Sequence, residues 1–171
     1  LTFTNCTQSV IVKKAELSGS KSVFIPTNGA FSSPASQNYA FGTGDLTIQG
    51  WFRPATNTTL QTLFDFRRLS ATQGLRIVQD AQAIKVYNGT TLMISSCNIV
   101  TTTGTWMHIG ISRASGVIQL YVNGAQVGGN YADTNDYLYA ALYIGQDFNG
   151  ATNWSGHVDN IVIKKGTADY T

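Results

Sequence analysis

The sequence predicts an all-β protein, built as a sandwich of two antiparallel sheets. Three observations favour this fold class. Charged residues make up only 12% of the 171 residues, whereas 17 are glycine and many others are Thr, Ser or Asn, a composition that favours strands and turns over helices. Apolar and polar residues alternate along many short segments, which is the period of a strand with one buried face. Turn-forming residues separate these segments.

The alternation places the strands in order along the chain. In the segment 106–122, for example, Met107, Ile109 and Ile111 share one face, with polar or small residues on the other. By contrast, 27–44 is rich in Ser, Asn and Gly and is expected to cross one end of the sandwich without a strand. Strands are expected near 9–17, 21–26, 46–53, 60–67, 74–79, 141–146 and 156–165, and hairpins at 83–96, 106–122 and 117–128.

The hairpins follow from three short turn sequences. Asn88-Gly89 and Asn123-Gly124 both separate alternating runs, and Ala114-Ser115-Gly116 joins two more. Asn and Gly accept the positive φ that tight hairpin turns require.

In the last expected strand, 156–165, the alternation of buried and exposed positions is interrupted once. Val158 faces the core on one parity, whereas Ile161 and Ile163 take the other. One extra residue at Asp159-Asn160, a β-bulge, would bring all three to the core and re-aim the carboxylate of Asp159. Two interpretations of that carboxylate stay open: it accepts backbone N–H groups and locks the strand, or it is an oxygen ligand of a hard cation.

Five segments carry a family resemblance: FGTGDLTIQGWFRP (41–54), TLFDFR (62–67), WMHIGISRASGVIQLYVNG (106–124), LYIGQDFNG (142–150) and WSGHVDNIVIKKGTADYT (154–171). Over residues 17–171 the chain resembles the laminin G-like, concanavalin A-like jelly-roll family. More narrowly, it resembles the branch found in bacteriophage fibres, tail appendages and capsid decorations. The resemblance implies one jelly-roll domain over 1–171, with 1–16 as a linker plus first strand, cut from a longer chain.

The resemblance also implies a structural calcium ion. Asp159 matches the family's aspartate ligand in the final strand, and the backbone carbonyls of Gly19 and Lys21 would complete the site. Relatives commonly have a small or acidic residue where this chain has Lys21, so the lysine ammonium is an alternative occupant of the cation position. No other cofactor is expected.

The residues needed for catalysis are not apparent in the sequence, so we expect no enzyme activity. Glu16 is the only glutamate, and no two aspartates alternate along one strand face, whereas glycoside hydrolysis needs a pair of carboxyl groups. His108 and His157 come with no nucleophile motif. A net charge of +2 without a basic stripe predicts no nucleic-acid partner, and no apolar run is long enough to insert into a membrane. Cys6 and Cys97 are interpreted as free thiols, although a single disulfide stays open.

Two loop clusters combine aromatic rings with polar side chains, the combination that sugar-binding sites use. They are the candidate ligand-binding residues, with packing of a sandwich end or a subunit interface as the alternative. The first cluster is Tyr131, Asp133, Asn135, Asp136 and Tyr137, and the second is Asp147, Phe148, Asn149 and Trp154.

These observations, with the resemblance, suggest two settings for a non-enzymatic module. The first is the surface of a phage virion, where the module decorates the capsid, a fibre or a tail appendage and binds a host glycan. Its partners there would be other virion proteins and copies of itself, as a trimer by analogy. The alternative is a carbohydrate-binding or adhesion module of a bacterial surface or secreted protein. Sequons at Asn5, Asn57, Asn88 and Asn153 would carry sugar only in a eukaryotic secretory setting.

Overall fold

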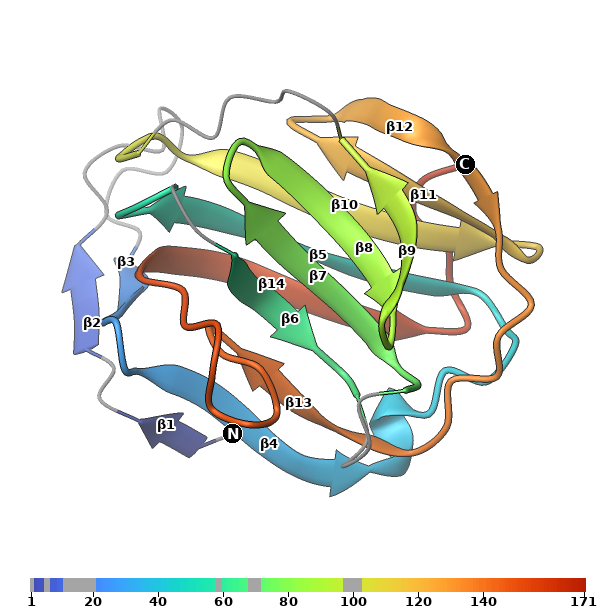
Figure 1. The fold of residues 1–171 in the computed structure, drawn as a ribbon, viewed down its shortest axis with the longest axis horizontal. Helices are drawn as coiled ribbons and strands as arrows, with labels where there is room; N and C mark the ends of the chain where they lie inside the picture. The colour runs from blue at the N-terminus through green and yellow to red at the C-terminus, as the bar shows by residue number, and fades with distance from the viewer. Residues whose placement is uncertain (1, 5–6, 11–20, 58–59, 68–71, 97–102) are drawn as a thin grey trace.

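The computed structural model describes residues 2–4, 7–10, 21–57, 60–67, 72–96 and 103–171, with only the backbone of the first two ranges described (Figure 1). These residues form two seven-stranded antiparallel sheets, which confirms the predicted all-β sandwich. Sheet A contains, in spatial order, β1 (Thr2–Thr4), β4 (Ala30–Ser36), β13 (Ala140–Ile144), β6 (Gln61–Asp65), β7 (Leu75–Asp80), β8 (Ala83–Asn88) and β9 (Thr91–Ser95). Sheet B contains β12 (Ala125–Ala132), β11 (Val117–Val122), β10 (Met107–Ala114), β5 (Leu46–Pro54), β14 (Gly156–Lys165), β3 (Lys21–Ile25) and β2 (Thr7–Val10).

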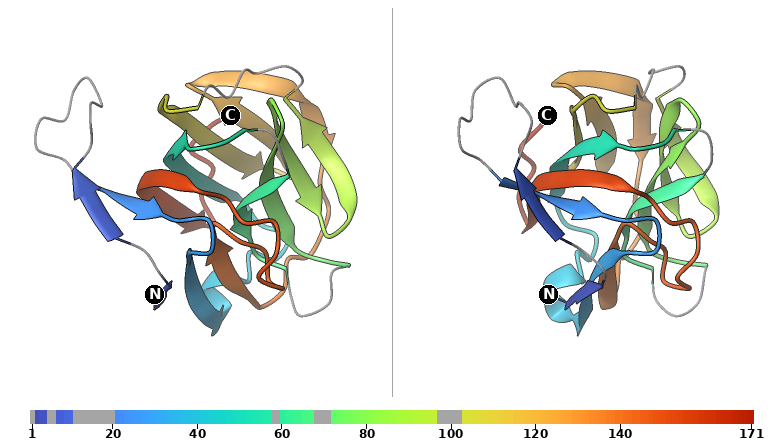
Figure 2. Two further views of the ribbon diagram at one scale, coloured as in Figure 1. Left: turned by 60° about the vertical axis from the view of Figure 1, so that its left-hand side comes forward. Right: turned by 90° about the vertical axis from the view of Figure 1, so that its left-hand side faces the viewer.

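The core lies between the two layers, which the turned views of Figure 2 show beside one another. Phe52 of β5 contacts Phe64 of β6 edge to face, with ring centroids 5.5 Å apart, and so joins the two sheets. Trp154 is fully buried and packs edge-on against Phe52 at 5.7 Å. Burial of such rings, with edge-to-face geometry, contributes a large share of the packing energy of a small core.

The predicted hairpins are confirmed, with one shift of register. Asn123-Gly124 and Ser115-Gly116 form two-residue turns, and all four residues have the positive φ of that turn type. In the remaining hairpin, Asn88 is paired with Thr91, so the turn consists of Gly89 and Thr90 rather than Asn88 and Gly89.

The predicted bulge of the last strand is also confirmed. The register of β14 against β5 shifts between Asp159 and Val162, and Asn160 takes a φ of 47°. Val158, Ile161 and Ile163 therefore all pack on the core. β5 makes room for the inserted side chain with a glycine, because a Cβ on Gly50 would lie only 2.4 Å from Cδ1 of Ile161.

One sequence prediction about the fold is wrong. The segment 27–44 contains β4, which pairs with β1 and β13, followed by a 3₁₀ turn at Gln37–Tyr39. The sequence of β4 hides it, because Pro34 and several serines replace the usual alternation. The predicted strand at 9–17 overlaps β2 only in part, and its remainder lies outside the described residues.

The C-terminal residues 166–171 lie across the outer face of sheet B. The ring of Tyr170 stacks on Tyr121 with centroids 4.7 Å apart, and its hydroxyl donates to Gln49. The ring needs the space above Gly110, where a Cβ would come within 3.1 Å of it. Across the described ranges, no helix has the length and apolar character needed to cross a bilayer.

Candidate functional site

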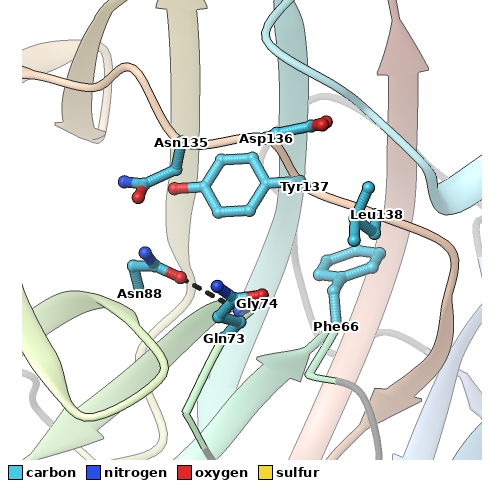
Figure 3. A pocket seen from close by; sticks show the side chains of 8 residues that line it. All are labelled: Phe66, Gln73, Gly74, Asn88, Asn135, Asp136, Tyr137 and Leu138. Atoms are coloured by element: carbon cyan, nitrogen blue, oxygen red, sulfur yellow. Dashed lines mark hydrogen bonds between the residues drawn. The ribbon is translucent and has the colours of Figure 1, made fainter.

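A pocket of about 170 Å³ opens at one end of the sandwich, between the end of sheet A and the loop that joins β12 to β13. Figure 3 shows Tyr137 and Asn135 along one side, Gln73, Gly74 and Asn88 along the other, and Phe66 with Leu138 closing one end. Asp136 completes the lining. The lining is mixed, with two aromatic rings, three side-chain amides and one carboxylate.

The loop side of the pocket is held in place by a buried arginine. Arg113 and Asp133 are both fully buried and form an ion pair, with Nη1 of Arg113 3.0 Å from Oδ2 of Asp133. The guanidinium also donates to the backbone carbonyls of Gly42, Gly44 and Asn135, at 2.7, 2.8 and 3.1 Å. Since every contact is internal, this pair fixes the shape of the loop and does not face a ligand.

Tyr137 forms the aromatic wall. Its backbone exchanges two hydrogen bonds with Gly42, the guanidinium of Arg113 lies 4.9 Å from its ring centroid, and its hydroxyl donates to Sδ of Met93 at 3.7 Å. Burial raises the pKa of Tyr137, and the negative charge of Asp133 raises it further, so the hydroxyl stays protonated. The ring is thus a rigid, neutral surface.

The sheet side of the pocket depends on a glycine. Gly74 has a φ of 118°, and a Cβ there would lie 2.6 Å from the carbonyl oxygen of Phe66. The N–H of Gly74 donates to Oδ1 of Asn88 at 3.0 Å (dashed line in Figure 3). This bond fixes the orientation of the Asn88 amide, whose Nδ2 makes no hydrogen bond to the described residues and remains available as a donor.

The remaining polar groups leave further capacity for hydrogen bonds. Asn135 donates from its backbone N–H and from its side-chain Nδ2 to Oδ1 of Asp133, and its side-chain oxygen Oδ1 remains as an acceptor. The carboxylate of Asp136 is exposed and has no hydrogen bond or ion pair with the described residues. The pocket therefore offers amide donors, amide acceptors and one negative charge beside the exposed side chain of Leu138 and the buried rings of Phe66 and Tyr137.

The structure brings together three residues of the first predicted cluster. Asn135, Asp136 and Tyr137 line the pocket. Tyr131 is half-buried and packs against the core, and Asp133 is fully buried with Arg113. We therefore leave Tyr131 and Asp133 out of the candidate site.

The second predicted cluster lies elsewhere, in the loop between β13 and β14. Asp147 is buried and accepts hydrogen bonds from the N–H groups of Asn149 and Ala151. Phe148 lies 4.6 Å below the guanidinium of Arg67. Trp154 belongs to the core, so only Phe148 and Asn149 are accessible to solvent in this cluster.

Two carboxylates do converge in this region, on Arg67. Its Nη2 lies 2.6 Å from Oδ2 of Asp65 and 3.4 Å from Oδ2 of Asp147. Asp65 is fully buried and also accepts the backbone N–H groups of Arg67 and Phe148. Because both carboxylates are held by a cation and by N–H donors, the cluster is a buried ion pair rather than a pair of proton-transfer groups.

The predicted calcium ligands are described only in part. Asp159 is half-buried and Oδ1 accepts the N–H of Asn160 at 2.7 Å, which matches the strand-locking interpretation. Lys21 is exposed at the start of β3, and Gly19 lies outside the described residues, as do Cys6 and Cys97. Among the described residues, no three His, Cys, Asp or Glu side chains are grouped so that they could hold a metal ion. Calcium stays a prediction.

Sequence reasoning missed both Arg113 and the sheet side of the pocket. Arg113 had a visible signal, because it continues the inward parity of Ile109 and Ile111 and a buried cation needs an acidic partner. Gln73 and Gly74 had none, since they come near the pocket only through the pairing of β7 with β8.

The two-sheet topology and the end pocket define a jelly-roll sandwich of the concanavalin A-like type. A family model described as the concanavalin A-like lectin/glucanases superfamily matches residues 17–167, and the chain belongs to this family. No match is found among curated protein sequences.

Solved structures show the same fold at low identity. Domains LG4-5 of the mouse laminin α1 chain superpose with a TM-score of 0.68 at 15% identity, over 84% of this chain and 40% of that chain. This chain therefore spans less than half of that laminin structure. Domain 4 of AbnA, an extracellular arabinanase of Geobacillus stearothermophilus solved with arabinotriose, superposes with a TM-score of 0.62 at 18% identity, over 95% of this chain and 83% of that chain. The CBM40 module of a Ruminococcus gnavus sialidase, bound to α2,3 sialyllactose, superposes with a TM-score of 0.61 at 9% identity, over 75% of this chain and 79% of that chain.

Proposed function

We propose that this protein is a non-catalytic carbohydrate-binding module that holds a glycan in the pocket between Tyr137 and Gly74. The observation that carries the proposal is the pocket's mixed lining. The exposed side chain of Leu138, beside the buried rings of Phe66 and Tyr137, can contact the apolar face of a sugar, while the amides of Asn88 and Asn135 and the carboxylate of Asp136 can bind its hydroxyl groups.

The size and charge of the pocket narrow the ligand. Its volume of about 170 Å³ is below the ~300–1,000 Å³ of pockets that enclose drug-sized ligands. It therefore suits one sugar ring at a time, such as the end of a glycan chain. Since Asp136 is the charged group in the lining, the ring in the pocket is neutral.

Structural relatives support a sugar ligand as a class. The arabinanase domain and the CBM40 module named above were both solved with oligosaccharides. At 18% identity or less they share the fold, so the residues that bind sugar in this chain rest on its own pocket. The described carboxylate pair at Arg67 is locked in an ion pair, which supports binding without turnover.

A glycan array followed by titration calorimetry tests the proposal. We expect the protein to bind a neutral glycan, and the Gln73→Trp variant to lose that binding because the larger side chain fills the pocket. Gln126→Trp is the matched control, since Gln126 is exposed on β12, away from the pocket. Equal binding by both variants would refute the assignment of the pocket, and release of reducing sugar would refute the non-catalytic role.

The sequon at Asn88 provides a second test at the same site. Secretion from a eukaryotic cell that glycosylates Asn88 should abolish glycan binding, because the attached sugar would cover the pocket wall. Thr90→Ala removes the sequon without touching the lining and should restore binding. Undiminished binding by protein shown by mass spectrometry to carry a glycan on Asn88 would contradict the pocket assignment.

We further propose an extracellular setting, on a bacterial surface or in a secreted protein, which the sialidase and arabinanase modules support; a phage virion, which the sequence resemblance implies, is the alternative setting. In a virion the module would attach to other virion proteins and to copies of itself. Proteomics of purified particles distinguishes these settings, because a virion module would co-purify with phage particles at a fixed copy number.

A further inference from the structure

Arg76 presents an unusual guanidinium on the outer face of sheet A. It lies in a cross-strand row between Asp65 of β6 and Tyr87 of β8. It donates from Nε and Nη2 to the hydroxyl of Thr62, and from Nη2 to the hydroxyl of Thr152, at 3.0 to 3.3 Å. None of the hydrogen bonds among the described residues uses its Nη1, and none of its partners is a carboxylate.

The nearby carboxylates are already engaged. Both oxygens of Asp65 accept from Arg67, and Asp147 accepts from Arg67 and from two backbone N–H groups. Burial lowers the pKa of Arg76, the charge of Arg67 lowers it further, and the charges of Asp65 and Asp147 only partly oppose this. The half-buried cation is thus incompletely compensated.

The hydroxyl groups of Thr62 and Thr152 leave one hydrogen without an acceptor among the described residues. Their hydroxyl oxygens lie 2.8 Å apart, so one hydroxyl donates to the other while both accept from Arg76. Two hydroxyl groups carry two hydrogens, and the second has no acceptor among the described residues. When Thr62, which is fully buried, donates to Thr152, the free hydrogen belongs to Thr152, which is half-buried.

Thr152 is held at this place against its backbone preference. It has a φ of 47°, which a β-branched residue rarely adopts. Such strain persists where the surrounding structure holds it, and it is frequent at binding sites. Here it brings the hydroxyl of Thr152 beside Thr62 and Arg76.

We propose that Arg76, Thr62 and Thr152 form a second binding site, specific for the carboxylate of an acidic sugar such as a uronic or sialic acid. The carboxylate accepts from Nη1 of Arg76 and from the free hydroxyl of Thr152, and Tyr87 flanks the sugar ring. Guanidinium groups bind carboxylates with charge-assisted hydrogen bonds that a neutral sugar cannot match. This site is separate from the pocket at Tyr137 and does not depend on it.

Paired probes test the charge requirement. α2,3-Sialyllactose is compared with lactose, and trigalacturonic acid with its methyl ester, by titration calorimetry at low and high salt. We expect at least one acid to bind about 10- to 100-fold more tightly than its neutral partner, which is the range for charged hydrogen bonds. The pair that shows the difference identifies a sialic or a uronic acid, and the difference should shrink in high salt.

Two variants locate the site. Arg76→Gln should erase the preference for the acid while leaving any neutral glycan bound in the pocket unaffected. Lys85→Gln is the matched control, because Lys85 lies on the neighbouring strand β8 and pairs with Asp80. Thr152→Gly keeps the guanidinium and relieves the strained φ, and should also weaken binding of the acid. No preference for either acid, or a preference that survives Arg76→Gln, would overturn the proposal.

Discussion

Removing the carboxylate of Asp133 should be among the most destabilising single substitutions in this protein. Asp133→Ala leaves the guanidinium of Arg113 buried, with 0% exposure, and still bound to three backbone carbonyls but without a compensating charge. The change also frees two donors of Asn135. Breaking a buried pair in this way costs about 3–5 kcal/mol.

That cost is a large part of the total stability of a domain, about 5–15 kcal/mol. In a protein of this size, each kcal/mol shifts the melting temperature by about 2–4 °C. Asp133→Ala should therefore lower the melting temperature by roughly 6–20 °C. The pocket should lose glycan affinity as well, because the loop that carries Tyr137 loses its anchor.

Urea denaturation measures the effect, and two comparisons make it specific. The double variant Arg113→Met with Asp133→Ala should recover much of the lost stability, since no buried charge remains. Asp80→Ala breaks the more exposed pair with Lys85 and should cost less than about 1 kcal/mol. A loss below about 1 kcal/mol for Asp133→Ala, or a double variant no more stable than the single one, would refute the argument.

Three further predictions concern sheet B. Gly50→Ala should lower the free energy of unfolding by about 1–3 kcal/mol, because the new Cβ would collide with Ile161. Adding Ile161→Val should recover part of the loss. An unchanged midpoint in urea denaturation would contradict the packing of the bulge. Burial, and then the charge of Arg53, lower the pKa of His157, so stability is present above about pH 6.5 and is lost as the pH falls through the lowered pKa. His157→Gln should flatten this dependence between pH 7 and 5, and identical pH profiles would exclude His157 as its source. If Asp159 holds calcium, EDTA should lower the melting temperature of the parent but not of Asp159→Asn, and equal melts with and without EDTA count against calcium.

Much of the fold was predictable because the strands obey one rule. Where one face of a sheet is buried and the other is exposed to solvent, the alternation along the strand tells which side chains point into the core. It did so correctly for Met107, Ile109 and Ile111. The same rule located the bulge at Asp159, since a parity change within one strand requires an extra residue. β4 was missed because its serines and Pro34 do not alternate clearly.

The site was only half predictable, because a loop sequence does not state which side chains are buried. Asp133 and Asp136 look alike in the sequence, yet one is fully buried with Arg113 and the other is exposed beside the pocket. The difference depends on Arg113, 20 residues earlier, which pulls one carboxylate inward. Asn88 entered the pocket through strand register, a property that local sequence does not encode.

Residues 166–171 cover part of the outer face of sheet B, so that a binding partner cannot reach it. Since Tyr170 stacks on Tyr121 over Gly110, a molecule approaching the middle of that sheet would first have to displace residues 166–171. Removal of residues 167–171 would expose the face of the Tyr121 ring beside Gly110. Residues 166–171 thus cover this part of sheet B, whereas the two proposed ligand sites lie on sheet A and at the end of the sandwich.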